Sequence, residues 1–174
     1  MVNILSQSRT MTDSIKLCGD IIITDPCYVV QNDEDWDKCR YGEDMSNLGI
    51  KHYIVRDTLY GDWSCTTFDS NTKQPIGEFC ADAGMVGVFL LDEVLKYNPD
   101  FDYHINRPWT TTLIRNFKGA VSFQVVHYVG VYEDSNKFHK KGDSFEDDEV
   151  QVIGHGIDTQ TGKQISFIGK QTGF

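Results

Sequence analysis

Short runs of β-branched and aromatic residues, each closed by turn-forming residues, recur along this chain and constrain its fold more than any other feature. Residues 15–24 and 120–132 carry two of these runs, and the second alternates between two faces with period two. Turn residues 158–162 separate the runs 150–154 and 164–168, which predicts a β-hairpin. Seven to eight short strands and about two short helices predict a β-rich α+β domain with a mainly antiparallel sheet.

The length of 174 residues fits one domain. Residues 1–13 are polar and lack a period, so we expect a flexible leader before a single globular domain over 14–174, with Met11 as an alternative start. Helical turns are expected over 33–39 and over 93–97, the latter capped by Asp92. The charged stretch 133–148 predicts a mobile loop.

The formal net charge of −10 weighs against nucleic acid and anionic membranes as partners. It leaves a small molecule or a basic protein as the expected partner, with a homo-oligomer as an open alternative. The five cysteines are odd in number and form no C-x-x-C pair, which predicts a reducing compartment, the cytoplasm. No stretch approaches the ~20 apolar residues of a membrane span.

Several motifs that would indicate a metal or cofactor are missing. The histidines form no H-x-x-x-H or H-E-x-x-H pair, and neither common glycine-rich phosphate loop occurs. We therefore expect no cofactor and no metal. The acidic residues 143–149 lack EF-hand spacing, so they predict a solvated loop or an acidic patch for a basic partner.

The sharpest local feature is Asp25-Pro26-Cys27-Tyr28, directly after an apolar run. A catalytic hypothesis makes Cys27 a thiolate nucleophile, which requires a histidine base nearby in space. A structural hypothesis makes Asp25 the acceptor of an Asx-type turn and Cys27 a small buried apolar residue. Both stay open at this point.

Asp82 follows a second strand-like run and has small neighbours that allow close approach of a ligand or of backbone. One hypothesis pairs Asp82 with Asp25 across a shared cleft, and the other makes it a loop anchor. His155, between Gly154 and Gly156, predicts either a bulge or a ligand contact. Tyr28 and Trp63 are candidates for an aromatic pocket or for the core.

Residues 22–28, IITDPCY, resemble the (I/V)(S/T)DPCY element of a loosely defined group of small bacterial and phage proteins of unknown function. In that group a Gly-x-Trp strand and a (V/A)D(A/S)G element follow, and Gly61-Asp62-Trp63 and Ala81-Asp82-Ala83-Gly84 match them in order. The resemblance covers about the first 95 residues. It implies a bacterial or phage protein, in the host cytoplasm if phage-encoded, and it implies no reaction.

No catalytic set is complete, so the leading hypothesis is a non-catalytic binding protein that sequesters a small molecule or engages a basic protein. An anti-defence or immunity role follows by analogy only. The expected ligand contacts are Asp25, Tyr28, Trp63, Asp82 and His155, and Asp82→Ala is predicted to abolish ligand retention without unfolding the domain. A small hydrolase using Asp25, Cys27, Asp82 and His155 is one alternative, and a structural or assembly subunit is another.

Overall fold

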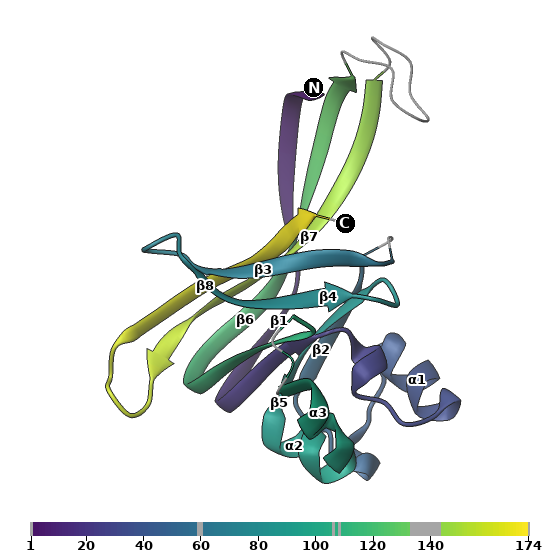
Figure 1. The fold of residues 1–174 in the computed structure, drawn as a ribbon, viewed down its shortest axis with the longest axis vertical. Helices are drawn as coiled ribbons and strands as arrows, with labels where there is room; N and C mark the ends of the chain where they lie inside the picture. The colour runs from purple at the N-terminus through teal and green to yellow at the C-terminus, as the bar shows by residue number, and fades with distance from the viewer. Residues whose placement is uncertain (1, 59–60, 106, 108, 133–143, 174) are drawn as a thin grey trace.

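One curled antiparallel sheet forms the body of the protein (Figure 1). The computed structural model describes residues 2–58, 61–105, 107, 109–132 and 144–173. Within them lie eight strands, in the sheet order β2-β5-β1-β6-β7-β8-β3-β4. Their bounds are β1 Val2–Thr24, β2 Tyr53–Asp57, β3 Trp63–Asp69, β4 Pro75–Ala81, β5 Met85–Leu90, β6 Thr111–Tyr132, β7 Ser144–Asp158 and β8 Gln164–Gly173. The predicted β-rich α+β class is confirmed.

Two of the strands are much longer than expected. β1 has 23 residues and β6 has 22, and they pair along almost their whole length, from Val2 opposite Tyr132 to Thr24 opposite Thr111. The segment predicted as a flexible leader, residues 1–13, therefore contributes its residues 2–13 to β1. A ladder bonds backbone groups, so the polar side chains of this segment do not prevent its pairing. Figure 1 shows β1, β6 and β7 projecting from the body as a three-stranded ribbon.

The structure describes only part of the segment 133–148, for which the sequence predicts a mobile loop. Residues 133–143, including Asp143 of the acidic run, lie outside the described residues. Ser144–Asp148 belong to β7 and pair with β6, so the loop prediction is wrong there. The hairpin predicted around residues 158–162 is confirmed, because Ile157 of β7 lies opposite Gln164 of β8.

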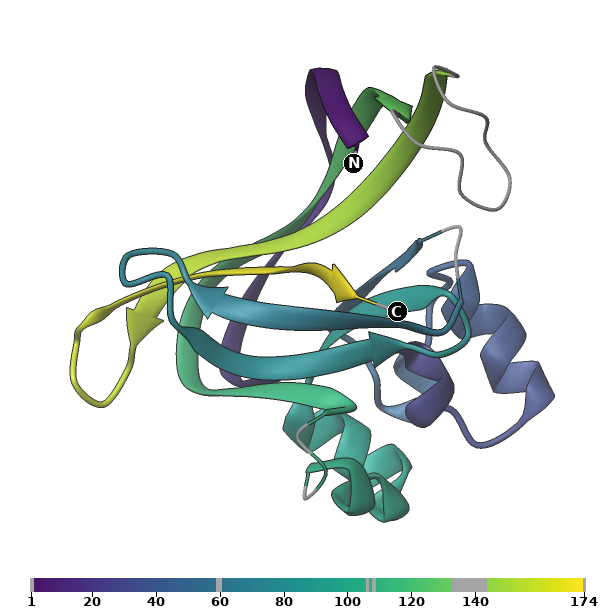
Figure 2. The ribbon, with the colours of Figure 1, turned by 45° about the horizontal axis from the view of Figure 1, so that its top comes forward.

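The helices lie together on one side of the sheet (Figures 1 and 2). They are α1 (Asp33–Arg40), α2 (Leu91–Tyr97) and α3 (Asp102–Ile105), with short 3₁₀ turns η1 (Pro26–Tyr28), η2 (Ser46–Leu48) and η3 (Pro99–Phe101). α1 and α2 occur where the sequence predicts helical turns. Asp92 lies in the first turn of α2 and does not cap it. No helix in the described part of the chain is long and apolar enough to cross a membrane.

Two apolar cores flank the sheet, and β1 contributes to both. Ile21 and Ile23 belong to the inner core, which fills the curl of the sheet together with Phe117 and Phe167. Ile22 points the other way, into an outer core between the sheet and the helices. Alternation along a strand buried on both faces explains why this segment reads as a continuous apolar run.

Candidate functional site

The Asp25 carboxylate lies at the end of β1 and is fully buried, with 0% exposure. Its Oδ1 accepts a hydrogen bond from the backbone N–H of Cys27 at 2.9 Å, which confirms the Asx-type turn. Its Oδ2 accepts from the N–H groups of Ala83 at 2.8 Å and Met85 at 3.2 Å. We call this arrangement of Asp25, Cys27 and residues 83–85 the Asp25 corner.

The turn between β4 and β5 presents these last two N–H groups to the carboxylate. Gly84 adopts φ +75°, a left-handed conformation that a side chain disfavours, and its N–H bonds the Ala81 carbonyl oxygen at 3.2 Å. The two sequence elements that contain Asp25 and Asp82 therefore do meet in space. They meet through the carboxylate of Asp25 and the backbone of the other element.

Electrostatics at the corner disfavour nucleophilic chemistry. Burial raises the pKa of Asp25, although hydrogen bonds from Cys27, Ala83 and Met85 oppose the shift. Burial, followed by the charge of Asp25, also raises the pKa of the Cys27 thiol far above its ordinary value. Cys27 is therefore held as a thiol at neutral pH, whereas a nucleophile requires the thiolate. Asp25 already accepts three backbone N–H groups, which leaves it poorly placed to act as a base.

Asp82 is exposed at the edge of this corner. A hydrogen bond with Asp62 raises the pKa of Asp82, and the Tyr28 hydroxyl acts in the opposite direction. That hydroxyl also lies 3.0 Å from Sγ of Cys80, and the Tyr28 ring packs 4.4 Å from the His104 ring between centroids. The structure thus brings four of the predicted residues together, namely Asp25, Cys27, Tyr28 and Asp82.

The other two predicted residues lie elsewhere. Trp63 is a core residue with 2% exposure, and its indole N–H donates to the Thr58 hydroxyl at 3.1 Å. His155 is exposed on β7, where its Nδ1 lies 3.0 Å from the Ser166 hydroxyl. The predicted set of ligand contacts is therefore divided among three places in the fold.

A depression of about 590 Å³ lies on the sheet where β1, β6 and β7 run side by side. Cys18, Lys118 and Ile157 are direct cross-strand neighbours, so their side chains share one face. Lys16 and Ala120 form the next row of that face. This is the face opposite Leu17, a residue of the inner core, and it is continuous with the face that the helices cover further along β1.

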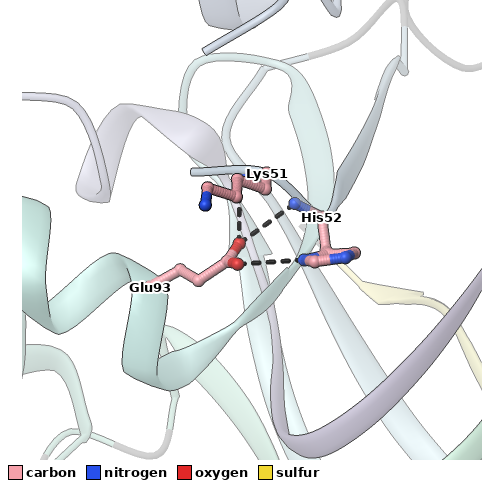
Figure 3. Close-up of polar contacts among 3 residues, drawn as sticks. All are labelled: Lys51, His52 and Glu93. Atoms are coloured by element: carbon pink, nitrogen blue, oxygen red, sulfur yellow. Dashed lines mark hydrogen bonds and ion pairs between the residues drawn. The ribbon is translucent and has the colours of Figure 1, made fainter. Parts of the chain in front are cut away.

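Leu90, the last residue of β5, and His52, just before β2, also line the depression. Glu93 of α2 fixes His52, as Figure 3 shows: Oε1 accepts the backbone N–H groups of Lys51 at 2.9 Å and His52 at 3.0 Å, and Oε2 lies 2.9 Å from His52 Nδ1. A carboxylate only accepts, so Nδ1 carries the proton and Nε2 is left for other partners. Burial raises the pKa of Glu93, but these bonds outweigh it and the net pKa lies below its ordinary value.

The size and lining of the depression fit a small-molecule site. Ligand pockets are typically about 300–1,000 Å³, mostly apolar, with a few placed polar groups. A second hollow near Trp109 and Cys80 has about 200 Å³. No group of three His, Cys, Asp or Glu side chains within the described residues is arranged to hold a metal ion.

Sequence reasoning missed the depression because its residues come from three strands far apart in the chain. Lys16, Lys118 and Ile157 become neighbours only through the register of β1, β6 and β7. The one local signal was alternation, since residues 16, 18 and 118, 120 occupy the non-core positions of their strands.

Comparison with known proteins assigns neither a family nor a function to this chain. No family model, curated protein or solved structure matches this chain. The resemblance of residues 22–28 to the bacterial and phage element stays a prediction.

Proposed function

We propose that this protein is a non-catalytic binding protein that holds a small, partly apolar molecule in the depression between β1, β6, β7 and His52. The observation that carries the proposal is a depression of about 590 Å³ with a mostly apolar lining, to which Lys16, Lys118 and His52 add polar groups. Ala120 and Ile157 offer apolar surface there, and 44% of Ile157 is exposed. A ligand that covers this surface removes it from water at about 25 cal/mol per Å².

Rigid support around the depression favours binding without a large rearrangement. Its floor belongs to three paired strands, and the hydrogen bonds from Glu93 hold the His52 backbone and ring. A preformed site loses less conformational entropy when a ligand binds. The hydrolase alternative has no comparable support, because Cys27 is held as a thiol and the Asp25 carboxylate is occupied by backbone N–H groups.

Titration with the neutral fluorescent probe N-phenyl-1-naphthylamine tests the proposal. We expect saturable binding, and we expect Ala120→Trp to remove most of it because the indole fills the depression. Asn71→Trp, at an exposed position in the β3–β4 turn, is the matched control and should bind like the wild type. Circular dichroism and thermal unfolding establish that both variants are folded. Absence of saturable binding, or unchanged binding by a folded Ala120→Trp variant, contradicts the proposal.

Cys18 gives a second readout in the unmodified protein. Its thiol is exposed and lines the depression, whereas Cys27 is half-buried at the Asp25 corner. Bound probe should slow alkylation of Cys18 by N-ethylmaleimide and leave the slower labelling of Cys27 unchanged, as followed by peptide mass spectrometry. Native mass spectrometry of freshly purified protein then asks whether a small molecule co-purifies and whether labelled Cys18 prevents its retention.

A further inference from the structure

Two lysines, Lys16 and Lys118, line the depression. Lys16 of β1 and Lys118 of β6 are exposed, and within the described residues no hydrogen bond or ion pair involves either ammonium group. No carboxylate side chain is among the described residues that line the depression. This concentration of unpaired positive charge contrasts with the net charge of −10 for the chain.

The register places the two lysines diagonally across neighbouring strands. Lys118 lies opposite Cys18, and Lys16 lies opposite Ala120, so both lysines are on the same face. Diagonal neighbours in an antiparallel pair are about 7–8 Å apart, within reach of long side chains. Two like charges at this spacing repel each other, and within the described residues no carboxylate pairs with either of them. An anionic group bound there would contact both ammonium groups and relieve that repulsion.

We propose that the ligand of the depression is an amphiphile with one anionic head group, a carboxylate or a phosphate, held between Lys16 and Lys118. Its apolar part lies over Ala120 and Ile157, on the β6 and β7 side of the lysines. Lysine suits this role because its ammonium is a mobile point charge, while the stem adds apolar surface to the wall of the site. The inference rests on the proposed function, since it assigns the chemistry of a ligand for the same depression.

The test compares three ligands with the same apolar chain: octanoate, octyl phosphate and octan-1-ol. Each is titrated against the wild type by displacement of N-phenyl-1-naphthylamine at low ionic strength. We expect at least one of the two anions to bind about tenfold more tightly than octan-1-ol, with the advantage shrinking at high salt. The ratio of octanoate to octyl phosphate affinity identifies the preferred head group.

Lys16→Met and Lys118→Met remove the charge and keep a flexible apolar side chain of similar length. Each should weaken binding of the preferred anion about three- to tenfold and leave octan-1-ol binding unchanged. Lys73→Met, at an exposed position in the β3–β4 turn, is the matched control and should change neither affinity. Thermal unfolding should show all three variants to be folded, because within the described part of the chain no hydrogen bond or ion pair involves the ammonium group of Lys16, Lys118 or Lys73.

The possible failures are distinguishable. Equal affinity for the anions and octan-1-ol overturns the anionic head group but leaves the depression as a site for apolar molecules. Parallel loss of anion and octan-1-ol binding in the lysine variants contradicts an electrostatic role for these residues. If neither the three ligands nor the naphthylamine probe bind the folded wild type, the proposed function itself fails.

Discussion

The polar groups of the Asp25 corner and those of the depression differ in how far they are hydrogen-bonded within the protein. At the corner, one buried carboxylate accepts three backbone N–H groups from two separate segments, so its bonding capacity is used within the protein. At the depression, the ammonium groups of Lys16 and Lys118 make no hydrogen bond or ion pair with any other residue that the structure describes. Polar groups that are satisfied internally hold the fold together, whereas those left unsatisfied at a concave apolar surface are available to a ligand.

The two regions also differ in how far apart their parts lie in the sequence. The Asp25 corner joins two short motifs, each with its own turn residues, so each is visible as a local pattern. The depression is built from single residues in alternating positions of three strands. Local sequence patterns therefore indicate the Asp25 corner more strongly than they indicate the depression.

The largest expected effect is the loss of stability in Asp25→Ala. The substitution leaves the N–H groups of Cys27, Ala83 and Met85 without their acceptor in a buried place, at a cost of about 3–5 kcal/mol in the free energy of unfolding. Urea unfolding measures the change. Asp37→Ala, at an exposed position of α1, is the matched control and should differ little from the wild type. A destabilisation of about 1 kcal/mol or less by Asp25→Ala would show that the corner is not a structural joint.

Sequence reasoning reached the fold class because strand alternation and turn chemistry are local signals. It gave the Asx-type turn of Asp25 as one of two hypotheses, and the hydrogen bond from Cys27 decides between them. It missed the first half of β1, since residues 2–12 have few apolar side chains and are held by pairing with β6. A partner strand more than 100 residues away leaves no trace in the segment itself.

Two of the predicted ligand contacts, Trp63 and His155, lie outside the lining of the depression. Trp63 is aromatic and follows a glycine turn, which fits a pocket or a core equally well, and only its 2% exposure decides for the core. His155 lies directly opposite Ala120 and therefore on the same face of the sheet as the depression, but it is not one of the residues that line the depression. Residue type suggested function at both positions, and only tertiary packing separates them from the depression.

The second-largest expected effect is a loss of stability in Glu93→Gln. The amide keeps one acceptor for the backbone N–H groups of Lys51 and His52 but places an NH₂ group against His52 Nδ1, which should cost about 0.5–1.5 kcal/mol. The wild-type pKa of Glu93 lies below its ordinary value of 4.5, so the carboxylate's contribution is fully present above that pH and is lost as the pH falls through the lowered pKa. Urea unfolding between pH 3 and 5.5 should therefore show the stability gap closing toward the acid end.

The affinity for N-phenyl-1-naphthylamine is a second measurement on Glu93→Gln. His52 forms one wall of the depression, so loss of its anchor should weaken N-phenyl-1-naphthylamine binding about two- to threefold. Gln substitution of an exposed acid on the same helix, Asp92→Gln, is the control for a change of charge alone. A stability gap that widens toward pH 3 would contradict the assigned role of the carboxylate.

The smallest expected effect is that of Asp82→Asn, and it separates the two regions most directly. The exposed carboxylate lies beside Asp62, which raises its pKa above the ordinary value of 3.8. For an acid with a raised pKa in the folded state, ionisation costs stability, so the wild type should lose stability relative to Asp82→Asn as the pH rises through the acid range. The gain in the variant should be within about 0.5 kcal/mol at neutral pH.

Asp62→Asn provides the matched variant for this last comparison. Asp62 adopts φ +56°, a conformation that asparagine also tolerates, so the substitution removes the charge without new backbone strain. In the Asp62→Asn background, the effect of Asp82→Asn on stability should depend less on pH, because burial still raises the pKa of Asp82 but Asp62 no longer does; a double-mutant cycle measures the difference. Both variants should bind N-phenyl-1-naphthylamine as the wild type does, because neither residue lines the depression. Loss of probe binding by a folded Asp82→Asn variant would instead move the ligand to the Asp25 corner, which contains three of the five ligand contacts predicted from the sequence: Asp25, Tyr28 and Asp82.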